Sequence, residues 1–195
     1  MTTKEHAIVA AEHGATMIGF VFAPSTRKIT IQQAKEITRL LPSSIEKVGV
    51  FVQPNLTYIH SVAQEVGLTM IQLHGEAANL ATKSLNYPVI RSLSSDMINN
   101  YDFSFDPPTY YLIDSPPGKY EGGSGISFDW NMLQKTEIAL PPFILAGGLH
   151  QDNVAQAIQQ TACIGVDVSS GVETNGEKDT QKIMTFLQEA KGARQ

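Results

Sequence analysis

Short apolar runs alternate with longer amphipathic segments along most of the chain. The apolar runs predict seven buried strands, at residues 17–22, 48–52, 70–73, 89–93, 110–114, 143–146 and 166–168. Between them lie segments with apolar residues at helical spacing, such as Leu56 to Val66 and Thr180 to Lys191. Strands that are apolar throughout and separated by helices are typical of a parallel sheet covered on both faces. The pattern therefore predicts an α/β fold built from repeated βα units.

The order of the predicted elements favours one architecture. A (β/α)8 TIM barrel has eight strands, each followed by a helix, whereas this chain opens with a helical segment that Gly14 ends. We therefore expect residues 1–195 to form a single TIM-barrel domain from which the first strand is missing. The missing strand would leave the edges of strands 17–22 and 166–168 unpaired, and unpaired edges recruit partners. We expect lowered stability or a homodimer as the consequence.

Composition narrows the class of protein. Hydrophobic residues make up 42% of the chain and charged residues 17%, which fits a folded globular protein. The net charge of −5 gives no electrostatic footprint for nucleic acid, and an anionic membrane would repel it. The single cysteine, Cys163, excludes an internal disulfide and a CxxC metal site, and no apolar run is long enough to span a membrane. We expect a cytoplasmic protein without a metal ion, and we interpret Cys163 as a buried thiol.

Two strands near the C-terminus end in small residues. Gly147 and Gly148 follow the sixth apolar run, and Ser169, Ser170 and Gly171 follow the last one. Glycine lets a backbone approach an anion closely, and uncovered N–H groups and hydroxyls supply hydrogen-bond donors to it. In TIM barrels the loops after strands seven and eight frequently form a phosphate site. These five residues are therefore the candidate phosphate-binding site.

Asp114 is the candidate general acid. It ends the apolar run that starts at Tyr110, and catalytic groups of TIM barrels lie at the carboxyl ends of strands. The burial and the neighbouring charges of a carboxyl in this position set how readily it gives up its proton. The glycine-rich segment 118–125 that follows could close over a ligand.

Four further charged or polar side chains could take part in binding. Asp167 lies inside the last apolar run, where an acid must point into the barrel mouth or be paired. Arg27, in the loop after the first run, suits a carboxylate or a phosphate. His74 follows Leu73 at a strand end, where it could be an acid–base group, but we expect a positioning or packing role. Arg91 lies within a strand and is expected to form a structural ion pair.

Together, several motifs resemble those of the phosphoribosylanthranilate isomerase family of tryptophan biosynthesis. The matching segments are Gly19-Phe20-Val21-Phe22 with Ser25-x-Arg27, Val48-Gly49-Val50-Phe51-Val52, Gln72-Leu73-His74-Gly75-Glu76, Leu112-Ile113-Asp114, Gly122-Gly123-Ser124-Gly125 leading to Phe128-Asp129-Trp130, Leu145-Ala146-Gly147-Gly148-Leu149 and Val166-Asp167-Val168-Ser169-Ser170-Gly171-Val172-Glu173. They cover essentially the whole chain, and the glycine-rich segment with its Phe-Asp-Trp is not a general feature of barrels.

The resemblance implies a TIM barrel and an Amadori rearrangement that needs no metal or organic cofactor. In that reaction a general acid protonates the ribose ring oxygen and opens the ring to a Schiff base. A general base then takes the proton from C2′, and the enolamine becomes a ketone. By resemblance, Asp114 is the general acid, and Arg27 and Asp167 hold the anthranilate end. The Gly147-Gly148 and Ser169-Ser170 pairs hold the phosphate, so the implied partner is a phosphorylated small molecule.

The general base of the family has no counterpart in this sequence. The family begins with a strand of the type Lys-x-Cys-Gly, whose cysteine is the base, and the 195 residues hold no such strand. Cys163 precedes the last strand, at the end away from the chemistry. Either Met1 is an internal methionine of a longer protein, or the chain is a true truncation. For this chain we expect a large loss of turnover, with binding of phosphate esters largely kept.

Two other functions stay open at this point. One is a different phosphosugar barrel enzyme, similar to indole-glycerol-phosphate synthase. It is weaker, because no lysine lies at the carboxyl end of a strand to act as the general acid, and Lys47 lies at a strand start. The other is a non-catalytic phosphosugar-binding protein, which the missing base favours.

Overall fold

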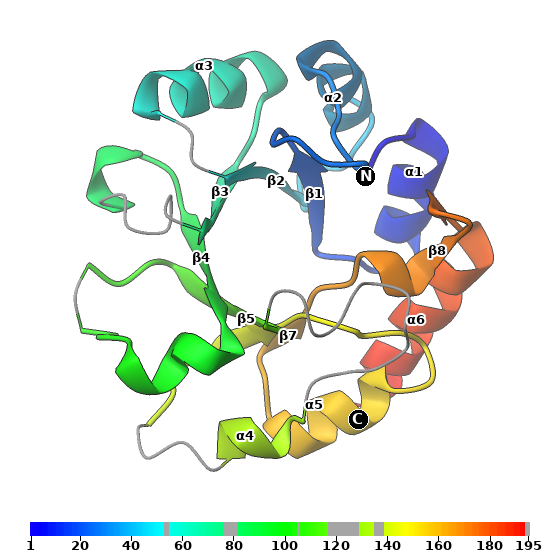
Figure 1. The fold of residues 1–195 in the computed structure, drawn as a ribbon. Coiled ribbons are helices and arrows are strands. Elements are labelled where there is room, and N and C mark those ends of the chain that lie inside the picture. The colour runs from blue at the N-terminus through cyan, green and yellow to red at the C-terminus, as the bar shows by residue number, and fades with distance from the viewer. Residues whose placement is uncertain (53–54, 76–81, 105, 117–128, 135–138, 194–195) are drawn as a thin grey trace. The chain divides into compact units, whose positions relative to one another are not determined.

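A computed structural model describes residues 1–52, 55–75, 82–104, 106–116, 129–134 and 139–193. The chain divides into two compact units. Unit 1 comprises Met1–Ser92 with Ser104–Thr109, and unit 2 comprises Leu93–Phe103 with Tyr110–Gln195. Each unit alternates strands with helices, as the apolar runs predict (Figure 1).

Unit 1 holds parallel strands joined by helices. Its elements are α1 (Lys4–Glu12), β1 (Met17–Val21), α2 (Ile31–Thr38), β2 (Glu46–Val52), α3 (Leu56–Val66), β3 (Met70–His74), the 3₁₀ turn η2 (Thr82–Ser84) and β4 (Val89–Ser94), whose last residues belong to unit 2. The strands pair in chain order, β1 with β2, β2 with β3 and β3 with β4, all in parallel. The register places Val50 beside Gln72 and Leu73 beside Arg91. The carboxyl ends of these strands therefore lie at one edge of the sheet.

Unit 2 repeats this pattern, with its strands β6 and β7 shorter than those of unit 1. Its elements are η3 (Ser95–Asn100), β5 (Tyr110–Asp114), α4 (Asn131–Gln134), β6 (Phe143–Leu145), α5 (Val154–Thr161), β7 (Gly165–Val166), η4 (Ser170–Val172), β8 (Glu173–Thr174), β9 (Glu177–Lys178) and α6 (Thr180–Gly192). β5 pairs with β6 and β6 with β7 in parallel, and β8 pairs with β9 in an antiparallel hairpin. The strands expected from the seven apolar runs are thus present, and they confirm the α/β class.

The last parallel strand is shorter than the sequence predicts. The apolar pattern places Asp167 inside a strand at 166–168, whereas β7 ends at Val166. The N–H of Asp167 still donates to the carbonyl oxygen of Leu145 at 2.8 Å. Asp167 therefore lies at the point where the chain leaves the sheet, and not within the strand.

Capping side chains set where the helices begin. Thr30 accepts a hydrogen bond from the N–H of Gln33, and the Gln33 side chain accepts one from the N–H of Thr30. Asn55 and Asp179 begin α3 and α6 in a similar way. Gly67, with a left-handed φ of 75°, ends α3. None of the helices in the described part of the chain is long and apolar enough to cross a membrane.

Large apolar side chains from strands and helices form the core of each unit. In unit 1, Phe20 of β1 and Ile59 of α3 are fully buried. In unit 2, Leu145 of β6 and Phe186 of α6 are buried in the same way. Burying one side chain of this size contributes about 1.5–3 kcal/mol, so the core holds each helix layer to its strands.

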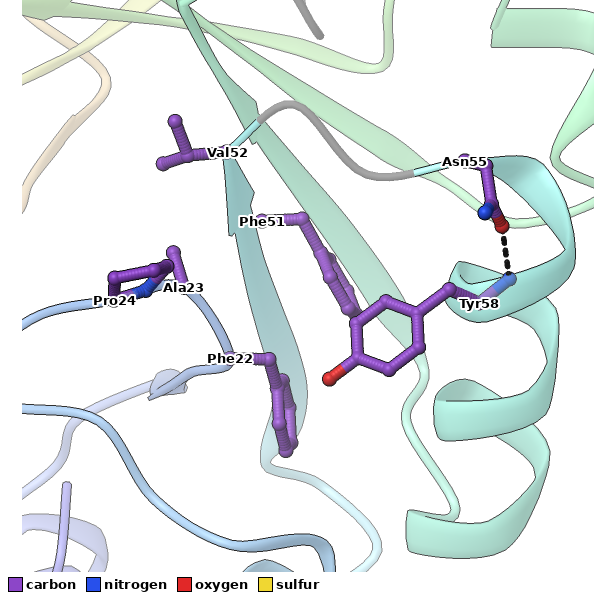
Figure 2. A pocket seen from close by; sticks show the side chains of 7 residues that line it. All are labelled: Phe22, Ala23, Pro24, Phe51, Val52, Asn55 and Tyr58. Atoms are coloured by element: carbon purple, nitrogen blue, oxygen red, sulfur yellow. Dashed lines mark hydrogen bonds between the residues drawn. The ribbon is translucent and has the colours of Figure 1, made fainter.

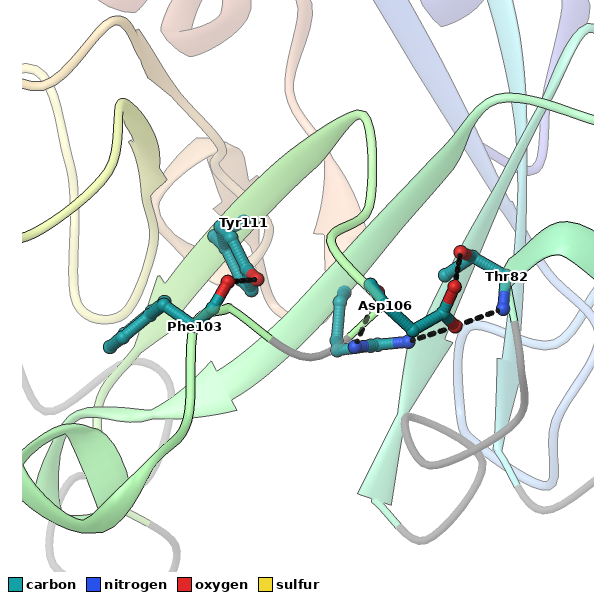
Figure 3. Close-up of polar contacts among 5 residues, drawn as sticks. Thr82, Phe103, Asp106 and Tyr111 are labelled. Carbon is teal, nitrogen blue, oxygen red and sulfur yellow. Dashed lines mark hydrogen bonds and ion pairs between the residues drawn. The ribbon is translucent and has the colours of Figure 1, made fainter.

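A buried ion pair joins β4 to Asp106 in unit 1. Arg91 is 3% exposed, and its Nη2 lies 3.4 Å from Oδ2 of Asp106. Its Nη1 donates to the carbonyl oxygen of Asp106 at 3.1 Å. Thr82 donates its N–H, at 2.6 Å, and its hydroxyl, at 2.8 Å, to the same carboxylate (Figure 3). These contacts confirm the structural ion pair expected for Arg91.

An aromatic cluster holds the approach to β5 in unit 2. The hydroxyl of Tyr111 donates to the carbonyl oxygen of Phe103 at 3.2 Å (Figure 3). The rings of Tyr101, Phe103 and Tyr111 pack edge to face, with centroids 4.9, 5.0 and 6.0 Å apart. Because offset or edge-to-face contacts of this kind are favourable, the cluster fixes the start of the strand that ends in Asp114.

We expect Asp106→Asn to lower the stability of the fold at neutral pH. The hydrogen bonds from Thr82, and then the charge of Arg91, hold the pKa of the Asp106 carboxyl below its ordinary value of 3.8. A lowered folded-state pKa contributes stability above the ordinary value, and that stability is lost as the pH falls through the folded-state pKa. Urea unfolding midpoints of variant and wild type should therefore differ at neutral pH and converge in acid.

The matched control for this prediction is Asp96→Asn, at an exposed carboxylate. It should unfold like the wild type across the whole pH range. A deficit of Asp106→Asn that stays constant from neutral pH into acid would contradict the account.

Candidate functional site

Two strand ends lie against each other in unit 2. Gly147 and Gly148 follow β6 with left-handed φ values of 87° and 64°. After β7, Gly171 packs on the backbone of Leu149 so closely that a methyl group there would overlap the Leu149 carbonyl oxygen and lie 2.8 Å from its carbon. The turn after β6 and the turn after β7 are therefore in backbone contact. The five residues expected to bind phosphate come from these two adjoining turns.

Asn153 holds the first of these turns in shape. Its side-chain oxygen accepts from the N–H of His150 at 2.8 Å, and its Nδ2 donates to the carbonyl oxygen of Gly148 at 3.0 Å. Asn153 stands at the N-cap of α5 but makes no capping hydrogen bond with its side chain. The side chain therefore stabilises the glycine turn instead of the helix end.

Asp114 lies beside the same glycine turn. Its Oδ1 accepts from the N–H of Ser115 at 2.7 Å and from the Ser115 hydroxyl at 3.3 Å. A Cβ atom on Gly147 would lie 2.8 Å from that Oδ1 and 2.6 Å from the Ser115 nitrogen. Only a glycine fits at position 147, and its absent side chain leaves the room in which the carboxylate sits.

Asp167 is electrostatically coupled to Asp114. Desolvation by the surrounding protein, and then the negative charge of Asp114, raise the pKa of the Asp167 carboxyl, while Lys178 opposes the rise. The residue as a whole is exposed, so water reaches it and moderates the effect of desolvation without reversing its direction. Both causes favour the protonated form of the Asp167 carboxyl beside the two turns.

Lys178 is a site residue that sequence reasoning missed. It lies on β9, and its Nζ donates to the carbonyl oxygen of Ser169 and to Oε1 of Glu173, both at 2.7 Å. The signal was present, because Asn175-Gly176 is a typical two-residue hairpin turn, with φ values of 54° and 84°. Recognising that turn predicts a hairpin that pairs Lys178 with Glu173.

Arg27 and His74, the other predicted binding residues, lie in unit 1. Arg27 is half-buried in a short loop, where its N–H donates to Oγ of Ser25 at 3.0 Å. His74 ends β3, and its Nε2 lies 2.7 Å from Nε2 of Gln72 and 3.1 Å from Oγ of Ser92. These two partners are buried, so the imidazole is held in one orientation. This supports the positioning role expected for His74, which stays a prediction.

A pocket of about 330 Å³ opens elsewhere in unit 1 (Figure 2). It is lined by Phe22, Ala23, Pro24, Phe51, Val52, Asn55 and Tyr58. The rings of Phe22 and Phe51 stack at 5.4 Å, and Tyr58 meets Phe51 edge-on (Figure 2). This lining holds no carboxylate and no cation, and none of the predicted site residues. It is therefore unsuited to acid–base chemistry on a phosphorylated sugar.

A sequence profile of the N-(5'phosphoribosyl)anthranilate (PRA) isomerase family matches residues 1–189. The chain belongs to this family. Among named PRA isomerases, that of Bacillus cereus is 44% identical over 196 residues, covering 98% of this chain and 96% of that protein. That of Listeria monocytogenes is 43% identical over 189 residues, covering 94% of this chain and 91% of that protein.

Solved PRA isomerases also share the fold. The enzyme from Thermotoga maritima matches with a TM-score of 0.86 and 34% identity, covering 98% of this chain and 96% of that chain. Another, in complex with reduced 1-(o-carboxyphenylamino)-1-deoxyribulose 5-phosphate, matches with a TM-score of 0.83 and 33% identity, covering 98% and 95%. These neighbours are TIM barrels, which confirms the predicted fold class, and the described residues of this chain form seven parallel strands. A further neighbour consists of monomers generated from the dimeric Thermotoga maritima enzyme, and a homodimer of this chain stays a prediction.

Part of the PRA isomerase resemblance lies outside the described residues. The segment Gly122-Gly123-Ser124-Gly125 and Phe128 fall there, together with the loop expected to close over a ligand. Cys163 is described: it is buried and precedes β7, at the amino end of that strand. This confirms the interpretation of Cys163 as a buried thiol away from the strand ends that carry Asp114 and Asp167.

We expect Gly171→Ala to destabilise the protein by about 1–3 kcal/mol, because the new methyl group forces the Leu149 backbone away. The same displacement should weaken binding of inorganic phosphate. Urea unfolding and isothermal titration with phosphate measure the two effects.

Gly192→Ala is the matched control, because a Cβ on Gly192, in the last turn of α6, meets no atom within 4 Å. It should leave phosphate binding unchanged and stabilise the fold by up to about 1 kcal/mol. Wild-type stability and phosphate affinity in Gly171→Ala would show that the two turns do not depend on their contact.

Proposed function

We propose that this chain catalyses the Amadori rearrangement of N-(5-phosphoribosyl)anthranilate to 1-(2-carboxyphenylamino)-1-deoxyribulose 5-phosphate. The observation that carries the proposal is the adjoining pair of turns after β6 and β7, with two carboxyl groups beside them. The neighbour solved with the reduced carboxyphenylamino-deoxyribulose phosphate is named for a ligand of this chemical type. A phosphate end and a proton donor are the two features that such a substrate requires.

The proton donor in this proposal is Asp114. The family role of general acid falls on this position, at the carboxyl end of β5. Its Oδ1 is held by the N–H and hydroxyl of Ser115, so the carboxyl keeps a fixed direction for proton transfer to the ribose ring oxygen. Ring opening takes its proton from the Asp114 carboxyl. Asp167, whose pKa is raised by burial and then by the charge of Asp114, is a second carboxyl beside the two turns.

The phosphate in this proposal binds to the two turns. Gly147 and Gly148 expose backbone N–H groups because no side chain covers them. Ser169, Ser170 and Gly171 add hydroxyl and backbone donors from the second turn. Successive N–H groups of this kind form an anion-binding concavity. Because the turns are in contact, they can hold the same phosphate.

By resemblance, Arg27 and Asp167 hold the anthranilate end of the substrate. His74 is a further predicted substrate-binding residue. A guanidinium such as that of Arg27 binds a carboxylate with paired hydrogen bonds. Substitution of Arg27 by Met should therefore raise KM for the anthranilate substrate more than it changes the affinity for inorganic phosphate.

A second candidate is phosphosugar binding without catalysis. It rests on the observation that the only cysteine in the 195 residues is Cys163, buried at the amino end of β7. We expect low turnover from these residues alone and restored turnover when the family strand of the type Lys-x-Cys-Gly precedes Met1. Continued inactivity with intact phosphate-ester binding would support the binding protein. Normal turnover of the 195 residues would contradict the need for that cysteine.

We expect Asp114→Asn to lower kcat by about 10²–10⁴-fold, the usual contribution of a general acid. Turnover is measured in the 195 residues alone or in the form with the added Lys-x-Cys-Gly strand, whichever is more active. Inhibition of Asp114→Asn by inorganic phosphate should equal that of the wild type. Asp152→Asn, at a carboxylate that is 78% exposed, should keep wild-type turnover. Equal turnover in Asp114→Asn and wild type would remove Asp114 from the mechanism.

A further inference from the structure

Lys178 joins the second turn to the hairpin that follows it. Its Nζ lies 2.7 Å from the carbonyl oxygen of Ser169 and 2.7 Å from Oε1 of Glu173. The side chains of Lys178 and Glu173 are only 11% and 7% exposed. An ion pair held this far from water is screened less than a surface pair. The ammonium is therefore kept at one place, against the backbone of the predicted phosphate turn.

The contact with Ser169 fixes the direction of a peptide group. In a trans peptide, the C=O of one residue and the N–H of the next point in opposite directions, and the described chain has no cis peptide. Ser169 adopts φ −120° and ψ −85°, outside the main allowed regions, so the backbone alone does not favour this orientation. The N–H of Val172 reaches the same carbonyl only at 3.5 Å. Lys178 is thus the closer of these two donors to the Ser169 carbonyl oxygen.

We propose that Lys178 is a positioning residue for the phosphate-binding turn: by binding the Ser169 carbonyl, it turns the Ser170 N–H in the opposite direction, as a donor for the phosphate. The inference deepens the proposed function and rests on it for the identity of the ligand. The carboxylate of Glu173 binds the same ammonium. The hairpin β8–β9 brings Lys178 back over the turn and is the element that makes this contact possible.

The charge of Lys178 also reaches the acid pair. It opposes the rise in the pKa of Asp167 that desolvation and Asp114 produce. Lys178 therefore provides positive charge beside the phosphate turn while limiting how strongly Asp167 holds its proton.

The test compares Lys178→Met with Lys182→Met. Lys182 is a matched control, because its Nζ also donates to a backbone carbonyl, that of Glu173, at 2.8 Å, and its removal changes the net charge equally. We expect Lys178→Met to weaken binding of inorganic phosphate by about tenfold or more, as the loss of one charge-assisted hydrogen bond implies. Lys182→Met should stay within about twofold. Equal losses in the two variants would overturn the proposal.

A readout in the ligand-free protein separates positioning from phosphate binding. Amide ¹H–¹⁵N shifts of Ser169, Ser170 and Gly171 should move in Lys178→Met and stay in place in Lys182→Met. Unchanged amide shifts in Lys178→Met would overturn the positioning role, whatever the affinity of this variant for inorganic phosphate. Absence of phosphate binding to the wild type, with the shifts moved, would count against the proposed function and leave the positioning of the turn supported.

Lys178→Met leaves the buried Glu173 carboxylate without this cation, which could unfold the hairpin. The double variant Lys178→Met/Glu173→Gln removes that charge and should keep the unfolding midpoint near that of Glu173→Gln alone. The double variant should still bind inorganic phosphate more weakly than Glu173→Gln alone. Full affinity in the double variant would show that the loss in Lys178→Met comes from misfolding and would contradict the proposal.

Discussion

The contact between the backbones of Gly171 and Leu149 is the constraint on which the candidate site depends. It leaves no room for a side chain on Gly171, and it places the turn after β7 directly on the turn after β6. The position of the Asp114 carboxylate depends in turn on Gly147, because a side chain at Gly147 would occupy the space of that carboxylate. The site thus depends on positions that have no side chain. At these positions the backbone can come close to an anion and present its N–H groups to it.

Charge is distributed around these turns in a way that suits proton transfer next to a phosphate. Burial, and then the like charge of Asp114, raise the pKa of the Asp167 carboxyl. Lys178 balances this tendency from β9, where Glu173 holds it in place. The two carboxyls and the anion-binding turns therefore lie together in unit 2, with the ammonium of Lys178, on the hairpin, against the second turn.

The strands could be predicted from sequence because each is a nearly continuous apolar run. A run of that kind can be recognised without knowing the tertiary structure. Arg91 could be predicted to pair because a buried guanidinium needs an acceptor. Its partner, Asp106, could not, because residues 104–109 have no periodicity that tells where they fold. The end of β7 was placed wrongly for a related reason: Val168 continues the apolar pattern, but the chain leaves the sheet at Asp167. The contact of Lys178 with Ser169 depends on a hairpin whose turn residues are visible and whose direction of folding is not.

A crystal structure of the protein soaked in inorganic phosphate tests the central claim most directly, since that claim is that the two adjoining turns bind one phosphate. The account predicts an anion within hydrogen-bond distance of backbone N–H groups from both turns, the one at Gly147-Gly148 and the one at Ser169-Ser170-Gly171. An anion bound by only one turn, or bound elsewhere while both turns stay empty at saturating phosphate, would contradict it.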